Sequence, residues 1–85
     1  MFYVYVLKLN NGYLYIGFTT ALKNRLRQHH NGESKYTKNF RPLSLVYYEA
    51  YASETDARAR EISLKKHKGT YGHLKKRIAR SISKK

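Results

Sequence analysis

The sequence predicts a mixed α/β fold of the α+β kind, in which a three-stranded sheet is flanked by helices in the order β-β-α-β-α-α. Three short runs rich in Val, Tyr, Leu and Ile are typical of strands: Phe2–Leu9, Tyr13–Phe18 and Leu43–Ala50. Other segments instead carry apolar residues at spacings of three and four, as helices do. The chain has 85 residues, so we expect a single domain over residues 1–85, with an antiparallel or mixed sheet covered by helices.

The first two strands are joined by a hairpin, whose register decides which side chains share a face. Asn10-Asn11-Gly12 between the strands is a strong turn signal. A two-residue turn would pair Asn10 with Tyr13, whereas a three-residue loop with a left-handed Gly12 would pair Leu9 with Tyr13. The second register separates the faces more cleanly, so we predict the three-residue loop. Its aliphatic face holds Val4, Val6, Leu14, Ile16 and Phe18, and its tyrosine face holds Tyr3, Tyr5, Tyr13, Tyr15 and Gly17.

A helix is expected directly after the hairpin. Thr19-Thr20 can cap it, and it runs from about Ala21 to His29 or His30. Arg25 and His29 are four residues apart, so they lie on one stripe of this helix. That stripe runs beside the two leucines that provide the core contact, Leu22 and Leu26. A polar loop, Asn31 to Pro42, then leads to the third strand.

Two further helices follow the third strand. Ser53 is expected to cap the first of them, with Asp56 as its capping-box partner, and that helix runs to about His67. Gly69 and Gly72 are expected to interrupt the chain before a last helix. The inner face of the last helix is marked by apolar residues at spacings of three and four: Tyr71, Leu74, Ile78 and Ile82.

Charge is the strongest compositional signal. The chain carries 18 Lys and Arg against 5 Asp and Glu, which gives a formal net charge of +13. Charge of this density favours a polyanionic partner. Nucleic acid is the commonest such partner, and an anionic membrane surface is the alternative. The candidate nucleic-acid contacts are basic residues of the predicted helices and loop: Lys23, Arg27, Lys35, Lys38, Arg41, Lys65, Lys66, Lys75, Lys76, Arg77 and Arg80.

Several classes of protein are excluded by what the sequence lacks. It has no cysteine, which excludes disulfides and thiolate metal sites and agrees with a cytoplasmic location. No apolar stretch is long enough to span a membrane, and the N-terminus lacks the basic region and cleavage site of a signal peptide. The motifs GxxxxGK, G-x-S-x-G and HExxH are absent, and the histidines lack zinc-ligand spacing.

One acid stands alone in the basic C-terminal part of the chain. Glu61 is the last acidic residue, and on a helix it shares a stripe with Ala57 and Leu64, the expected inward positions. A carboxylate on an apolar stripe is costly unless it is paired or binds a cation. Two interpretations stay open: a ligand for a metal ion, or a salt bridge to Arg58, Lys65 or Arg25.

Four other residues are candidates for chemistry. Arg25 can hold a phosphate through two hydrogen bonds and stabilise charge that develops on it. His29 can move protons near neutral pH. On a basic helix the alternative for Arg25 and His29 is a solvated charge pair. Tyr5 and Tyr15 stand close together on the hairpin, although tyrosine is also ordinary on a half-buried strand.

Taken in order, these residues resemble the GIY-YIG endonuclease family, in particular its small single-domain, UPF0213-like branch. That family carries a Gly-Ile-Tyr triplet and then Tyr-Ile-Gly, which stand here as Tyr3-Val4-Tyr5 and Tyr15-Ile16-Gly17. Arg25 matches the family's Arg ten residues beyond the second motif's Tyr, and His29 matches a His four further on. Glu61 matches the metal-binding Glu of a later helix. The resemblance extends to about Lys66 and includes segments 35–37, 41–43 and 46–49.

The resemblance implies a GIY-YIG nuclease-like fold and an activity. Such a protein is an endonuclease that hydrolyses phosphodiester bonds, here in DNA, in repair or recombination, with one divalent cation, Mg²⁺ or Mn²⁺. Glu61 would bind the cation. Arg25 would stabilise the charge on the phosphate, and Tyr5 and Tyr15 would position or activate the attacking water. His29 would accept a proton.

The sequence departs from the family pattern at three points. Tyr3 replaces the first Gly, Phe18 stands where repair-incision members have a Lys, and the Asn of homing members has no secure match between Thr70 and Ile82. Fuller members carry a separate DNA-binding domain, so a protein partner is expected to supply specificity. The competing functions are a non-catalytic nucleic-acid-binding module with the same basic fold, and a basic protein of membrane surfaces or ribosomes.

Overall fold

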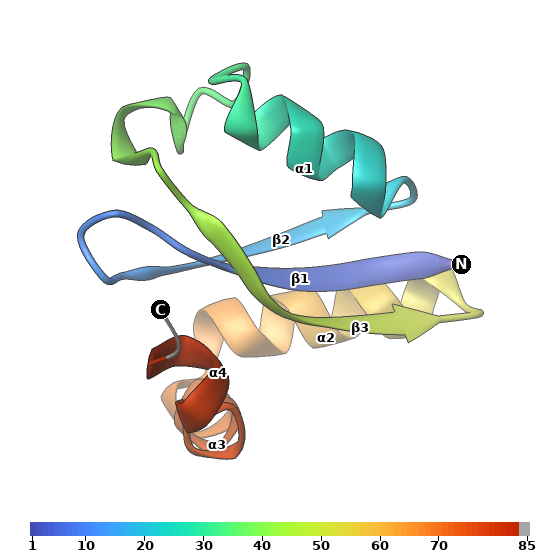
Figure 1. Ribbon diagram of the computed structural model, residues 1–85. Coiled ribbons are helices and arrows are strands. Elements are labelled where there is room, and N and C mark those ends of the chain that lie inside the picture. Colours follow the sequence, from blue (N-terminus) through green and yellow to red (C-terminus); the bar gives the residue numbers. More distant parts are fainter. Residues whose placement is uncertain (84–85) are drawn as a thin grey trace.

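The computed structural model describes residues 1–83 and consists of a three-stranded antiparallel sheet with helices on both faces (Figure 1). The strands are β1 (Phe2–Lys8), β2 (Leu14–Thr19) and β3 (Ser44–Tyr51), and β1 is central in the order β2-β1-β3. The helices are α1 (Leu22–His30), the 3-10 helix η1 (Lys38–Phe40), α2 (Glu54–Lys66), α3 (Lys68–Arg77) and α4 (Ala79–Ser83). The predicted α+β fold is confirmed. Within residues 1–83, no helix has the length and apolarity needed to cross a bilayer.

The hairpin between β1 and β2 has the predicted three-residue register. The Leu9 N–H donates to the Tyr13 carbonyl at 2.8 Å, and the Gly12 N–H donates to the Leu9 carbonyl at 2.9 Å. Gly12 has a φ of +86°, a left-handed conformation that glycine adopts without steric cost. Tyr5 therefore pairs with Gly17, and the aliphatic and tyrosine faces are divided as predicted.

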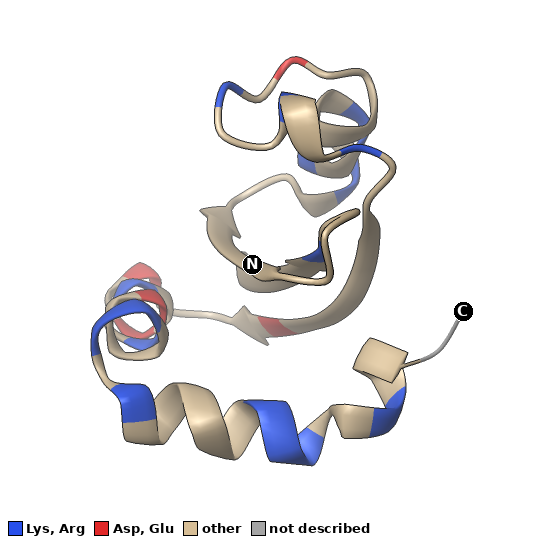
Figure 2. Cartoon of the chain, turned by 90° about the vertical axis from the view of Figure 1, so that its left-hand side faces the viewer, with Lys and Arg blue, Asp and Glu red and all other residues tan. Residues whose placement is uncertain are grey.

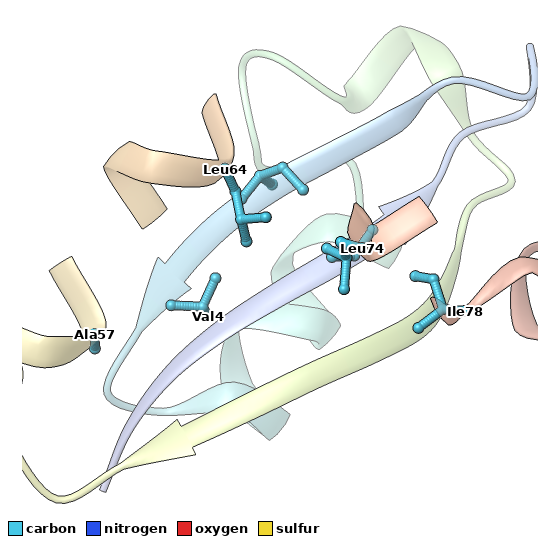
Figure 3. Close-up of a cluster of buried hydrophobic side chains, with 7 residues drawn as sticks. Val4, Ala57, Leu64, Leu74 and Ile78 are labelled. Carbon is cyan, nitrogen blue, oxygen red and sulfur yellow. The ribbon is translucent and has the colours of Figure 1, made fainter. Parts of the chain in front are cut away.

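The aliphatic face of the sheet packs against α2 and α3. Buried side chains of β1 and β2 form one cluster with side chains from these helices and with Ile78, which follows α3: Val4, Val6, Ile16, Ala57, Leu64, Leu74 and Ile78 (Figure 3). Ala57 and Leu64 are the inward positions of α2 that the spacing predicted. Burial of one such Val or Leu side chain contributes about 1.5–3 kcal/mol, so this cluster fixes α2, and with it Glu61, against the sheet.

Helix α1 covers the tyrosine face (Figure 1). Leu22 and Leu26 pack on the buried Tyr5 and Leu7, as their spacing predicted. The predicted cap is wrong: the Thr19 hydroxyl accepts the Ala21 N–H at 3.1 Å ahead of the helix, and the N-cap residue makes no side-chain hydrogen bond. Threonine hydroxyls bond readily to a backbone N–H two residues on, which here forms a turn before α1 begins at Leu22.

The C-terminal helices differ in part from the prediction. Ser53 does cap α2, because its hydroxyl accepts the Asp56 N–H at 3.2 Å. Gly69 and Gly72, expected to interrupt the chain, lie inside α3. Each glycine costs about 1 kcal/mol in a helix, and the burial of Leu74 and Ile78 offsets this cost. The expected last helix is instead divided at Ile78, whose φ of −108° and ψ of 24° end α3 before α4.

The segment between α1 and β3 is less loop-like than predicted. It contains η1, and its Ser34 and Thr37 are buried, at 3% and 0% exposure. Arg41 fastens this segment, since its guanidinium donates to the carbonyls of Lys38 at 3.0 Å and His30 at 3.4 Å. The structure thus gives Arg41, a candidate nucleic-acid contact, a role in ordering the chain next to α1.

Candidate active site

Three buried polar side chains are connected in a row between β1, α1 and the segment that follows α1. The Tyr5 hydroxyl is hydrogen-bonded to His29 Nε2 at 2.8 Å, and His29 Nδ1 is hydrogen-bonded to the Thr37 hydroxyl at 2.7 Å. All three residues are at most 1% exposed. Both ring nitrogens of His29 are satisfied inside the protein, as buried polar groups require, and the ring is therefore held in one orientation.

Burial keeps His29 neutral at physiological pH. The pKa of His29 is lowered to about 4, first by burial and then by the positive charges of Arg25 and His30. A neutral imidazole accepts a hydrogen bond at one nitrogen while it donates at the other, so His29 can act as an acceptor toward Tyr5. The alternative of a solvated Arg25–His29 charge pair is wrong for His29, because its side chain is fully buried.

Gly17 allows the Tyr5 phenol to pass beneath the edge strand of the sheet. A β-carbon at Gly17 would lie 2.7 Å from Cε1 of Tyr5, and closer still to Cζ and the hydroxyl oxygen. Because β2 is an edge strand, a phenol in this position reaches the border of the sheet, where groups from its two faces can meet. The glycine of Tyr15-Ile16-Gly17 is thus required by packing.

Tyr15 and Arg25 lie around the same phenol. The Tyr15 ring centroid is 6.4 Å from that of Tyr5 and 5.5 Å from that of His29. The Arg25 guanidinium donates to Gln28 Oε1 at 2.8 Å and has a long contact, 3.5 Å, with the Ser34 hydroxyl. Burial raises the pKa of Tyr5, and Arg25 opposes this increase. The positive charge of Arg25 therefore acts directly on the phenol.

Glu61 lies on α2, in the helix layer on the opposite face of the sheet from α1. Its side chain is 14% exposed and pairs with Lys65 at 3.0 Å and with Arg58 at 3.7 Å. Two of the three salt-bridge partners that the sequence predicted are therefore present. The negative charge of Glu61 adds to the effect of burial in raising the pKa of Tyr5.

A second acid, Glu49 on β3, is committed to structure. It accepts hydrogen bonds from Arg60 Nε and Nη2, both at 3.0 Å, and from the hydroxyls of Tyr47, at 2.6 Å, and Tyr51. Burial raises the pKa of Glu49, but these hydrogen bonds outweigh it and lower the pKa overall. Burial and Glu49 raise the pKa of Tyr51 to about 12. Both carboxylate oxygens of Glu49 already accept hydrogen bonds from these partly buried groups. Glu61, in contrast, pairs with the half-exposed side chains of Lys65 and Arg58.

A basic pocket adjoins Tyr15. It has a volume of about 320 Å³, lies between β2 and the junction of α2 with α3, and is lined by Tyr15, Lys65 and Lys68 among others. Lys65 therefore connects this pocket with Glu61. A further cation, the Arg58 guanidinium, lies 3.7 Å over the ring of Phe18.

Glu61 is suited to a cation that the substrate helps to hold. Residues 1–83 contain no cluster of three or more acidic, His or Cys side chains that could enclose a metal ion. Mg²⁺ does not require such a cluster, because it commonly binds one or two carboxylates, several waters and substrate phosphates. Lys65 and Arg58 are half-exposed side chains, so they can turn away from Glu61 when a cation binds. The donor set therefore fits Mg²⁺ or Mn²⁺.

The other basic residues lie on separate surfaces (Figure 2). Lys23 and Arg27 are exposed on α1, and Arg27 donates to Asn24 Oδ1 at 3.1 Å. Lys35 and Lys38 are exposed in the segment after α1. The remaining candidates lie on the C-terminal helices: Lys65 and Lys66 on α2, Lys75, Lys76 and Arg77 on α3, and Arg80 on α4. The structure thus divides these residues between the two helix layers.

Three neighbours of the site were not predicted from the sequence: Gln28, Ser34 and Thr37. The signal for Gln28 was its position three residues after Arg25 on one helix. Ser34 and Thr37 lie on a polar segment, and no local spacing indicates that they are buried. The Glu49–Arg60 pair was also missed, because it joins a strand to a helix across eleven residues.

Comparison with known proteins shows which family the chain belongs to. The family model of the GIY-YIG catalytic domain matches residues 1–79, so the chain belongs to the GIY-YIG family. A UPF0213 protein of Staphylococcus epidermidis is 42% identical over 64 residues, which cover 74% of this chain and 78% of the relative. A UPF0213 protein of Streptococcus pyogenes is 45% identical over 67 residues, 78% of this chain and 73% of the relative.

A solved structure resembles the chain as well. The solution NMR structure of a UPF0213 protein from Bacillus halodurans has a TM-score of 0.56 and 32% sequence identity, and the match covers 87% of this chain and 82% of that one. These relatives are all UPF0213 proteins. The resemblance to the family, expected from the two triplets and from Arg25, His29 and Glu61, is confirmed, as is the resemblance to this branch, which segments 35–37, 41–43 and 46–49 indicated.

Proposed function

We propose that this protein is an endonuclease that uses one divalent cation, Mg²⁺ or Mn²⁺, to hydrolyse phosphodiester bonds in DNA. The observation that carries the proposal is the buried 2.8 Å hydrogen bond between the Tyr5 hydroxyl and His29 Nε2. Membership of the GIY-YIG family, which consists typically of endonucleases, supports the same class of reaction.

Tyr5 and His29 provide a path for the proton of the attacking water. As the water oxygen bonds to phosphorus, the Tyr5 oxygen accepts a water proton and passes its own hydroxyl proton to His29 Nε2. Nε2 must be the unprotonated nitrogen for this transfer. The Thr37 hydroxyl stabilises that tautomer by accepting a hydrogen bond from Nδ1–H. Thr37 is thus a positioning residue, which acts through His29.

The low pKa of His29 sets the energetic cost of this transfer. Placing a proton at pH 7 on a group with a pKa of about 4 costs about 4 kcal/mol. A phosphate bound nearby adds negative charge, which raises the pKa of His29. The acceptor therefore becomes stronger when substrate is present.

Arg25 and Glu61 act on the phosphate. Arg25 neutralises the negative charge that grows on the phosphate oxygens during the reaction. The bond from phosphorus to the leaving oxygen then breaks, and the leaving oxygen takes a proton from solvent. Tyr15, next to Tyr5, positions the attacking water. Glu61 holds the cation, which when bound polarises the phosphate and acidifies water.

One observation favours a second function. Both oxygens of Glu61 already face positive groups, Lys65 and Arg58, as they would in a protein that needs this acid only for structure. A module that binds nucleic acid without cleaving it would use the same fold and the same net charge of +13.

Nicking of supercoiled plasmid in Mg²⁺ or Mn²⁺ distinguishes the two functions. Glu61→Gln keeps the shape of the side chain and removes its charge, so we expect nicking to fall roughly 100-fold or more. The matched control is Glu54→Gln on the same helix. Glu54 is an exposed acid that also pairs with Arg58, and its loss should leave nicking unchanged. The opposite outcome is a wild-type protein that binds DNA but cleaves plasmid, branched and linear substrates no better than Glu61→Gln does. That result would show that the protein binds nucleic acid without cleaving it.

A further inference from the structure

The tyrosine face of the sheet is open on its β3 side. Tyr5, beneath α1, is 1% exposed, whereas Tyr48, its partner in the pairing of β1 with β3, is 51% exposed. Ala50, two residues further along the same face, is also exposed. The ring of Tyr3 lies edge-on to that of Tyr48, with centroids 6.0 Å apart. Helix α1 therefore leaves an aromatic pair uncovered.

A groove of about 620 Å³ separates this aromatic pair from the first turns of α1. Its volume is within the range of roughly 300–1,000 Å³ that is common for ligand sites. Lys23 and Arg27, four residues apart on α1, line the helical wall together with Asn24, and the described residues that line the groove include no acid. The groove thus combines aromatic surface with positive charge and a side-chain amide.

The groove lies on the other side of α1 from the candidate active site. Arg25 and Arg27 are two residues apart, which turns their side chains about 200° from each other around the helix axis. Arg25 acts on the Tyr5 phenol, whereas Arg27 lines the groove. A polymer that lies in the groove and crosses α1 would therefore reach the candidate active site.

We propose that this groove binds an unpaired nucleotide, whose base stacks on Tyr48 next to Tyr3 and whose flanking phosphates contact Lys23 and Arg27. Aromatic side chains within a basic groove are the usual combination for single-stranded nucleic acid, because every base has a face that can stack. In a duplex the bases already stack on one another and cannot enter. The protein therefore prefers single-stranded regions. This inference rests on the nucleic-acid binding in the proposed function, and cleavage is not needed for it.

Binding in EDTA tests the groove without any contribution from cleavage. Fluorescence anisotropy would compare a labelled oligothymidine of about 12 nucleotides with a blunt duplex of the same length. We expect the single strand to bind more tightly, and Tyr48→Ala to weaken its binding about 10-fold or more while duplex binding changes less than about twofold. Tyr36→Ala is the matched control, since it removes a tyrosine that is 73% exposed and lies outside the groove; it should change neither affinity.

A tryptophan substitution reports stacking directly. The chain has no tryptophan, so Tyr48→Trp introduces one fluorophore at the groove. Its emission should be quenched by oligothymidine, and that of Tyr36→Trp should not. Equal binding of single strand and duplex, or single-strand binding that Tyr48→Ala does not weaken, would overturn the proposal. Quenching of Tyr48→Trp by phosphatidylserine vesicles but not by oligothymidine would overturn it in favour of a membrane surface. A protein that binds as expected but never cleaves DNA would refute the proposed function and leave this inference intact.

Discussion

Acid should destabilise this protein through His29. The imidazole is fully buried between the hydroxyls of Tyr5 and Thr37, and burial lowers its pKa from 6.5 to about 4. Below pH 6.5 the unfolded chain takes up a proton at this residue, whereas the folded chain does not. The stability that neutral His29 contributes is therefore present above pH 6.5 and is lost as the pH falls through about 4.

The two pKa values give the size of this effect. A difference of about 2.5 units corresponds to about 3 kcal/mol. Most of this is lost by pH 4.5, where we expect about 2.5 kcal/mol. A domain of 85 residues has a total free energy of unfolding of roughly 4–13 kcal/mol. One histidine therefore accounts for a substantial part of the acid sensitivity.

Urea unfolding at pH 7 and pH 4.5, followed by circular dichroism, measures the loss. Between these pH values the wild type should lose about 2.5 kcal/mol more than His29→Gln, whose side chain does not titrate. His73→Gln changes an exposed histidine on α3, away from His29, and should lose as much as the wild type. Two results would refute this role of His29. One is the same pH dependence of stability in the wild type and in His29→Gln. The other is an NMR titration that places the pKa of the His29 ring near 6.5.

Three further predictions concern single side chains. Gly17→Ala places a β-carbon against the Tyr5 ring and should lower the free energy of unfolding, measured with urea, by about 1–3 kcal/mol. Adding Tyr5→Ala removes the ring and should recover part of that loss. Strictly additive losses in the double variant would show that the β-carbon and the ring do not clash. Arg25→Ala should lower kcat roughly 100-fold or more with little change in Tm, and a matching collapse of Tm would show that Arg25 is structural. Glu49→Gln removes the partner of Arg60 and should cost about 2–3 kcal/mol in unfolding free energy at pH 7. Because the pKa of Glu49 is lowered in the folded protein, the stability that its carboxylate contributes is present above the unfolded pKa of 4.5 and is lost as the pH falls through the folded pKa. A difference in unfolding free energy between the wild type and Glu49→Gln that stays constant down to pH 3 would contradict this prediction.

The hairpin and the inner faces of the helices were predicted correctly because local signals determine them. Asn10-Asn11-Gly12 and the alternation of the two strands allowed one register that separates the faces, and that register placed Tyr5 opposite Gly17. Spacing on α1 and α2 likewise identified the inward leucines and the position of Glu61. The family resemblance followed from these same residues, so it was accessible before any contact was known.

The burial of His29 and the course of the C-terminal helices depended on tertiary contacts. Helical spacing placed His29 beside Arg25, but its second partner, Thr37, comes from a segment whose sequence is polar throughout. Gly69 and Gly72 were expected to end helices on propensity alone, and a β-carbon at either position would meet nothing within 4 Å. Packing of α3 through Leu74, not contact at the glycines, therefore decides the helix. The catalytic roles of the site residues stay predictions.

Lys65 links substrate binding to the one acid of the candidate site. Its ammonium group is 3.0 Å from Glu61, and the same side chain lines the basic pocket next to Tyr15. Under the proposed function, a phosphate in that pocket competes with Glu61 for the half-exposed Lys65 side chain. The released carboxylate then faces a phosphate whose oxygens are themselves ligands for a divalent cation. If Glu61 binds a cation as proposed, the affinity for that cation should therefore increase when substrate is bound.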